Sequence, residues 1–142
     1  MPNELSDLCS VIEECYEYML AYAGQGLSGA SGGDGLIRDF LSRAAHALAG
    51  LENAYSSAVT KRILVPADPY AAFQAVLARD ARDSLAAVQL VLLQPGISSQ
   101  LIDNLNASIH LRALLTDLFL IDEILKGSQN QESPAGAAGS AH

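Results

Sequence analysis

The sequence contains no tryptophan, few aromatic residues and little charge. Of its 142 residues, 6% are aromatic and 17% are charged, whereas 50% are hydrophobic. A core without tryptophan must be built mainly from leucine, alanine, valine and isoleucine, which favours closely packed helices. Sparse charge leaves apolar surface that an oligomer or a partner can cover. The length is that of one domain with a core of its own.

Basic residues are scarce, and the first quarter of the chain has none. Residues 1–37 contain six acidic side chains, and the whole chain has eight lysine and arginine residues and a formal net charge of −8. Nucleic-acid binding needs a basic stripe that displaces counterions from phosphates, and the sequence has no such stripe. An acidic membrane surface would repel the chain for the same reason. We therefore expect neither a nucleic-acid partner nor a membrane partner.

Long apolar runs and a secretory leader are also lacking. No stretch reaches the roughly 18 uncharged apolar residues of a membrane-spanning helix, and the acidic N-terminal segment lacks the basic start of a signal peptide. These absences predict a soluble, cytoplasmic protein. Cys9 and Cys15 lie about 9 Å apart along one predicted helix, beyond the roughly 7 Å limit between Cα atoms in a disulfide. Two reduced core cysteines are expected.

Apolar residues recur at helical spacing in four segments, which predicts an all-α protein. The expected helices cover residues of about 3–23, 36–59, 69–93 and 99–126. Their short connections predict an antiparallel four-helix bundle with up-down-up-down topology, which dimerisation would complete or extend. We expect residues 1–127 to form this single domain. Residues 128–142 are small, polar and glycine-rich, and we expect them to be a disordered tail.

The predicted helix over 99–126 is the most apolar long segment, so the other helices should pack around it. Its main stripe recurs at alternating spacings of four and three residues and consists of Ala107, Leu111, Leu114, Leu118, Ile121 and Leu125. A second stripe, which includes Leu115 and Phe119, widens the apolar face. This pattern places the helix in the middle of the bundle or in the seam of an oligomer.

A glycine motif after the first predicted helix matches a nucleotide-binding pattern only on paper. Gly24, Gly26 and Gly29 have the spacing of the dinucleotide fingerprint. That fingerprint works between a strand and the helix whose N-terminus holds a pyrophosphate. Here it follows a helix, and no strand pattern is near. We interpret the glycines as a helix end and a loop.

One polar stripe on the fourth predicted helix is the best candidate for chemistry. Asp103, Asn106, His110 and Asp117 share it, and Asp117 has apolar helical neighbours. If it is buried, Asp117 needs an arginine, a histidine or a metal as partner. An alternative function is therefore a ferritin-like metal- or ligand-binding bundle with a degenerate site, in which Asp103, His110 and Asp117 would hold iron or zinc.

Two arguments weigh against this alternative. Ferritin-like di-iron bundles use Glu-x-x-His motifs that point inward, and the sequence contains no such motif. The polar stripe also has the composition of the solvent-facing side of an ordinary surface helix. We favour that interpretation and expect no metal and no cofactor.

The sequence offers no constellation for nucleophilic catalysis. Ser42 and His46 can meet one turn apart, but they lack an orienting acid and a pocket. We therefore predict no catalytic residues and a small acidic interaction, assembly or accessory protein that is not an enzyme. It would bind a protein partner, itself as a homo-oligomer, or both.

The predicted interaction surface has an acidic part and an apolar part. Its residues are Glu13, Glu14, Glu17, Leu118, Ile121 and Leu125. The glutamates would present charge to a basic partner, which speeds and orients association. The three aliphatic side chains would be core or seam residues.

Overall fold

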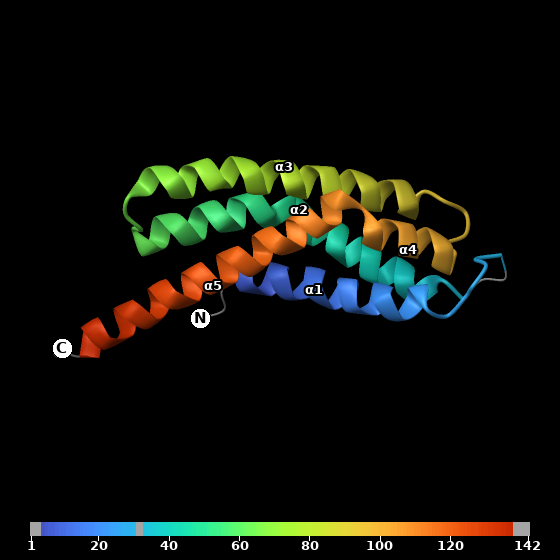
Figure 1. Cartoon of the computed structure of the whole chain (residues 1–142), viewed down its shortest axis with the longest axis horizontal. Helices are drawn as coiled ribbons and strands as arrows, with labels where there is room; N and C mark the ends of the chain where they lie inside the picture. The colour runs from blue at the N-terminus through green and yellow to red at the C-terminus, as the bar shows by residue number, and fades with distance from the viewer. Residues whose placement is uncertain (1–3, 31–32, 138–142) are drawn as a thin grey trace.

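The computed structural model describes residues 4–30 and 33–137 of the chain (Figure 1). Within these residues it contains five α-helices and no strand, so the all-α prediction is confirmed. The helices are α1 (Glu4–Ala23), α2 (Gly35–Arg62), α3 (Ala67–Leu92), α4 (Ser99–Ala107) and α5 (Ile109–Ala137). None of them, over the described part of the chain, is long and apolar enough to cross a membrane.

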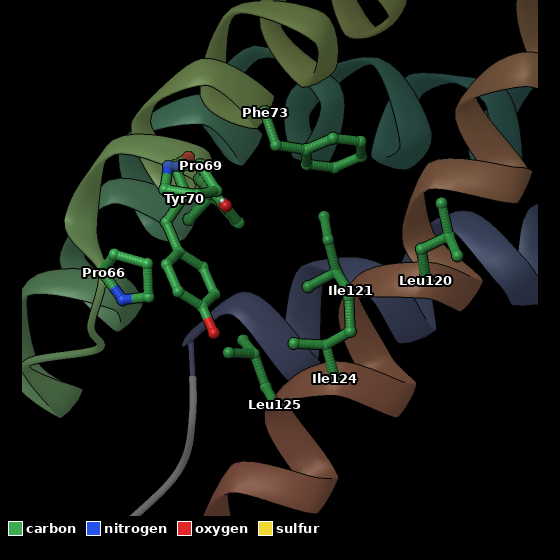
Figure 2. A pocket seen from close by; sticks show the side chains of 9 residues that line it. Pro66, Pro69, Tyr70, Phe73, Leu120, Ile121, Ile124 and Leu125 are labelled. Atoms are coloured by element: carbon green, nitrogen blue, oxygen red, sulfur yellow. Dashed lines mark hydrogen bonds between the residues drawn. The ribbon is translucent and has the colours of Figure 1, made fainter.

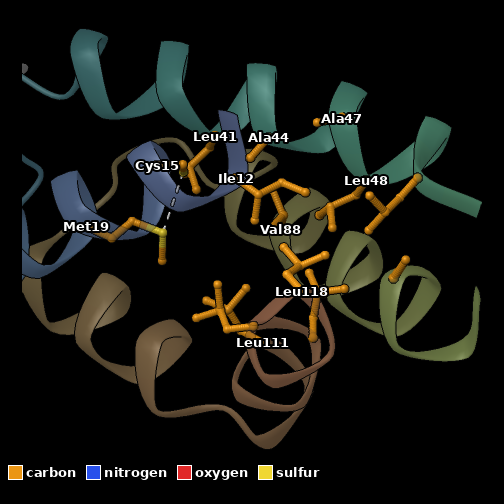
Figure 3. Packing of buried hydrophobic residues seen from close by; sticks show 14 of the residues in the cluster. Ile12, Cys15, Met19, Leu41, Ala44, Ala47, Leu48, Val88, Leu111 and Leu118 are labelled. Atoms are coloured by element: carbon orange, nitrogen blue, oxygen red, sulfur yellow. Dashed lines mark hydrogen bonds between the residues drawn. The ribbon is translucent and has the colours of Figure 1, made fainter. Parts of the chain in front are cut away.

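The core is formed by one buried stripe from each helix. α2 packs against both α1 and α3, while α5 packs mainly against α3 and α4 mainly against α1. Figure 3 shows Ile12 and Met19 of α1, Leu41 and Leu48 of α2, and Leu118 of α5 meeting in this core. The stripes follow the period of the sequence pattern, because each apolar face can leave water only against another helix.

Both cysteines are reduced, as predicted. Burial, together with the charges of Glu13 and Asp122, raises the pKa of the Cys9 thiol to about 12. Burial likewise raises the pKa of Cys15 to about 12. Since the thiolate is the reactive form, both side chains act as small apolar core residues.

The helix expected over 99–126 is two helices, because Ser108 ends one and begins the next. Its backbone is extended, with φ −64° and ψ 141°, directly after α4. Its hydroxyl oxygen then accepts a hydrogen bond from the backbone N–H of Leu111, at 3.3 Å, in the first turn of α5. This is the bond that an N-cap serine makes. The chain therefore has a fifth helix that the apolar pattern did not predict.

The connectors before α2 and before α4 meet at one end of the molecule (Figure 1). Ser99 joins them: its hydroxyl donates to the carbonyl of Tyr22 at 2.6 Å and accepts from the backbone N–H of Leu27 at 2.9 Å. The N–H of Ser99 donates to the Leu27 carbonyl at 2.8 Å. The glycine-rich segment is thus a loop after a helix, as the sequence indicated, and it is packed against the second connector.

Asp34 and Arg38 strengthen the same junction. Asp34 Oδ2 accepts from the backbone N–H of Ile97 at 3.1 Å and from Arg38 Nε at 3.2 Å. The guanidinium of Arg38 also donates to the carbonyls of Leu92 and Gln94, at 3.0 and 2.6 Å. The bond from Ile97 and the nearby arginine lower the pKa of Asp34. This network fixes where α4 starts, and hence the path of α5.

The last helix extends into the segment for which a disordered tail was predicted. α5 does not end at Gly127 but continues as helix to Ala137, and this end projects beyond the other helices in Figure 1. Glycine inside a helix costs only about 1 kcal/mol, so it need not stop one. Residues 138–142 of the predicted tail lie outside the described residues.

Candidate functional site

A groove of about 440 Å³ lies between the start of α3 and the middle of α5 (Figure 2). It is lined by Tyr55, Pro66, Pro69, Tyr70, Phe73, Leu120, Ile121, Ile124 and Leu125. None of these nine residues carries a charge. A groove of this volume with an apolar lining is the usual form of a binding site for an apolar group.

One wall of the groove is the start of α3. Pro66 and Pro69 stand where the helix begins, a place that tolerates proline because the first turn has no N–H partners to lose. Tyr70 and Phe73 follow on the next turn and bring their rings to the same side (Figure 2). The wall is therefore formed by rigid rings, which lose little conformational entropy when a ligand covers them.

The opposite wall and the floor come from α5 and α2. Leu120 and Ile124 are one turn apart on α5, and each is 49% exposed, whereas Ile121 and Leu125 are buried beneath them. Tyr55 of α2 donates its hydroxyl to the carbonyl of Tyr70 at 2.9 Å, which fastens α3 over the floor. Burial raises the pKa of Tyr55. The half-exposed wall is apolar surface that the described residues leave uncovered.

The predicted metal ligands do not form a site. Asp103 on α4 and His110 on α5 are exposed, while Asp117 is buried. The break at Ser108 removes the continuous helix on which their common stripe depended. No group of three or more His, Cys, Asp or Glu residues that could hold a metal ion occurs in the described ranges 4–30 and 33–137.

Asp117 is the most perturbed acid that the structure describes. Its side chain is 6% exposed, and its Oδ2 atom has no hydrogen-bond partner. Burial, followed by hydrogen bonding with Asp80 of α3 and the charge of that residue, raises the pKa of Asp117 to about 7. The sequence required an arginine, a histidine or a metal beside a buried Asp117. The structure instead places a second carboxyl group there.

The predicted interaction residues divide between the core and the surface. Leu118, Ile121 and Leu125 belong to the core, which is one of the two places expected for them. Glu14 and Glu17 are exposed on α1, and Glu13 is half-buried.

The structure adds a fourth acid to this surface. Burial, the nearby charge of Asp122 on α5 and that of Glu17 raise the pKa of Glu13. Glu13, Glu17 and Asp122 therefore form one acidic patch across α1 and α5, at whose edge Lys126 Nζ lies 3.6 Å from Asp122 Oδ2.

The groove was not identified from the sequence, although two signals pointed to it. Two prolines and two aromatic residues gather within Pro66–Phe73, and the last turns of the predicted fourth helix are apolar on most of their circumference. Each signal is also explained by an ordinary core. These two groups of residues form a site only because α3 and α5 bring them together.

The chain has no match among the known proteins with which it was compared. No family model matches it, and neither a curated protein nor a solved structure is detectably similar to it. Its function must therefore be argued from the groove and the charges around it.

Proposed function

We propose that this chain is a non-enzymatic interaction protein whose α3–α5 groove binds an amphipathic helix of a partner protein. The observation that carries the proposal is the uncharged lining of the groove, with Leu120 and Ile124 left half-exposed on one wall. Exposed apolar surface of this kind marks interaction sites. The groove can bind a ligand by removing its apolar surface from water and by matching its shape.

A helix suits the groove better than an extended strand. Each wall is itself helical, and its contact residues are one turn apart: Tyr70 and Phe73 on α3, Leu120 and Ile124 on α5. An amphipathic helix presents anchors at the same period, and such helices lie in apolar grooves between helices. An extended strand would instead need a sheet edge to pair with, and the described residues form no sheet.

The lining argues against a catalytic use of the groove. It contains no carboxylate, imidazole, thiol or amine, and its polar side-chain atoms are the hydroxyls of Tyr55 and Tyr70. The Tyr55 hydroxyl already donates to a backbone carbonyl. General acid–base catalysis uses histidine or a carboxylate more often than tyrosine, and it needs such a group within hydrogen-bond reach of the reacting atoms.

The charge of the protein favours a basic polar face on the partner helix. The formal net charge is −8, and the acidic patch of Glu13, Glu17 and Asp122 lies on the α1 side of α5, whose other side lines the groove. Opposite charges raise the rate of encounter and orient it. The same patch repels acidic competitors.

We also infer the finer architecture. α4 and α5 together take the fourth position of an antiparallel, up-down-up-down bundle, and the partner helix fills the space where α5 diverges from α3. In Figure 1 the connectors lie at alternate ends of the molecule, which supports this topology. The competing occupant of the groove is a second copy of the chain, which would make the protein a homo-oligomer.

The groove is tested with a designed peptide and charge substitutions on its wall. The probe is a fluorescent peptide of about 18 residues, five helical turns, with leucine on one face and lysine on the other. Leu120→Asp and Ile124→Asp should each weaken binding tenfold or more, since a carboxylate would be buried without a partner. Fluorescence anisotropy measures the dissociation constant.

The matched control is Phe119→Asp on the same helix, which is 61% exposed and outside the groove lining. It should leave the affinity unchanged. Equal losses in all three variants, or no binding by the wild-type protein, would reject the groove. A concentration-dependent dimer that Ile124→Asp dissociates would place a second copy in the groove instead of a partner.

The acidic surface is tested through association kinetics. Replacing Glu14 and Glu17 with glutamine should lower the association rate constant about threefold to tenfold at low salt, with little change in dissociation. Glu13 is left intact because it is half-buried. The control removes the same charge at exposed Asp39 and Asp103 on other helices. Stopped-flow anisotropy measures both rates, and equal slowing in the two variants would assign the effect to net charge alone.

A further inference from the structure

The hydrogen bond from Ser84 of α3 to the His110 carbonyl of α5 fixes how these two helices align, and one turn further along the seam Asp80 interacts with Asp117, next to the groove. Asp117 lies one turn before Leu120 and Ile121, which line the groove. Its side chain is 94% buried, since 6% of it is exposed, and its Oδ2 atom lacks a hydrogen-bond partner. Asp80 is half-buried on the facing helix. A buried carboxyl group thus meets a half-buried one.

The other charged groups along this seam leave the pair without a cation. His110 Nδ1 lies 4.0 Å from Asp83 Oδ2, and Ser84 Oγ donates to the His110 carbonyl at 3.0 Å. The neighbouring basic residues, Arg79, Arg82 and Arg112, are exposed. On the α2 side of α3, Glu52 accepts from Gln74 at 3.3 Å. No ion pair to Asp80 or Asp117 occurs among the described residues.

Two carboxylates in such a place can coexist only if a proton or a metal cation lies between them. A cation is poorly served here, because calcium and magnesium take about six oxygen ligands, and no cluster of three metal-binding side chains occurs in the described part of the chain. A proton needs only the two carboxyl groups. Burial and the neighbouring Asp80 raise the pKa of Asp117 to about 7, in the direction that retains a proton.

We propose that Asp80 and Asp117 share one proton, and that this proton is a latch that holds α5 against α3 and sets the width of the groove. With the proton in place, one carboxyl group donates to the other across the seam. Without it, two negative charges face each other and push the helices apart, beginning at the inner end of the groove. The latch stands on the carboxyl pair alone, whereas its effect on partner binding rests on the function proposed above.

The sign of the pH dependence follows from the two states. In the unfolded chain an aspartate loses its proton near pH 4, whereas the native pair keeps one proton to about pH 7. Between these values the native state binds more protons, so the free energy of unfolding falls as pH rises. The stabilisation is complete below pH 4 and is lost as pH passes through 7. The walls then lose their fixed spacing, and affinity for the peptide falls with them.

The latch is tested by carboxyl-carbon NMR titration and by hydrogen exchange on the full chain. The titration should show one proton lost from the pair with a midpoint near pH 7. Amides of residues 113–126, after correction for intrinsic rates, should exchange about tenfold faster at pH 8 than at pH 6, an added opening of about 1.4 kcal/mol.

Two variants and a control isolate the pair. Asp117→Asn removes the buried titrating group and should abolish the pH dependence of exchange. Asp80→Asn should only reduce it, because burial alone still raises the pKa of Asp117. Glu123→Gln removes an exposed charge from the same helix and should preserve it. Titration of both carboxyl groups below pH 5, or a pH dependence that survives Asp117→Asn, would overturn the latch. Exchange that depends on added Mg²⁺ or Ca²⁺ would replace the proton with a cation.

Peptide binding separates this inference from the function on which part of it rests. If the titration and exchange behave as expected but the Leu/Lys peptide binds at neither pH, the latch stands and the proposed function fails. If the peptide binds equally at pH 6 and pH 8 while both carboxyl groups titrate below pH 5, the function stands and the latch fails.

Discussion

Gly96→Ala is expected to destabilise the protein by about 2–4 kcal/mol, the range of severe steric substitutions. A Cβ atom at this position would overlap the carbonyl oxygen of Gly29 and lie 3.0 Å from its carbonyl carbon. These are backbone atoms, so no side chain can rotate away. Gly29 is itself constrained, because its φ of +80° is a conformation that favours glycine. Urea denaturation followed by circular dichroism measures the free energy of unfolding.

The matched control is Gly35→Ala, at the first position of α2. A Cβ atom there would meet nothing within 4 Å, so the change should alter stability by less than about 0.5 kcal/mol or raise it slightly. Equal stabilities for the two variants would mean that the connectors do not touch. The start of α4 and the path of α5 along the groove would then have no fixed anchor.

Leu118→Ala should cost about 3–5 kcal/mol, whereas Phe119→Ala at the next position should change stability by less than about 0.5 kcal/mol. Leu118 is fully buried, and Figure 3 shows it beside Val88 and Leu111 in the core. Phe119 is 61% exposed. Deleting the leucine leaves a cavity that its neighbours cannot close. Thermal and urea denaturation measure both changes.

The pair of neighbouring substitutions also tests the rotation of α5 about its axis. The apolar pattern assigned both residues to the widened apolar face of the predicted helix, and the structure buries only one of them. A greater loss of stability from Phe119→Ala than from Leu118→Ala would show that α5 is turned away from the orientation described. The walls of the groove would then be wrongly assigned.

The sequence predicted the buried stripes well because helical period alone determines them. Leu111, Leu114 and Leu125 are buried as expected. The break at Ser108 was missed because a serine can occupy either a helix interior or an N-cap, and its backbone conformation decides which. Ala107, placed in the main stripe by a continuous helix, is exposed because α4 has its own rotation.

The site was harder to predict than the fold because it depends on how two helices pass each other. The angle between α3 and α5 leaves Leu120 and Ile124 uncovered. The spacing of apolar residues in a sequence does not determine the angle at which two helices cross. For Asp117, the pattern left burial open, and the favoured interpretation as part of a solvent-facing stripe is wrong for this residue, which is buried. Its neighbour Asp80 belongs to another helix, and only the register of α3 against α5 brings the two carboxyl groups together.

The most direct test of the central claim is methyl NMR of the protein titrated with the Leu/Lys amphipathic peptide. Saturable shifts are expected at Leu120, Ile121 and Ile124, whose methyl groups line the groove. Ile109, exposed at the other end of α5, should remain unchanged. Shifts confined to Ile109 or to α1, or no shifts at peptide saturation, would contradict a helix-binding groove between α3 and α5.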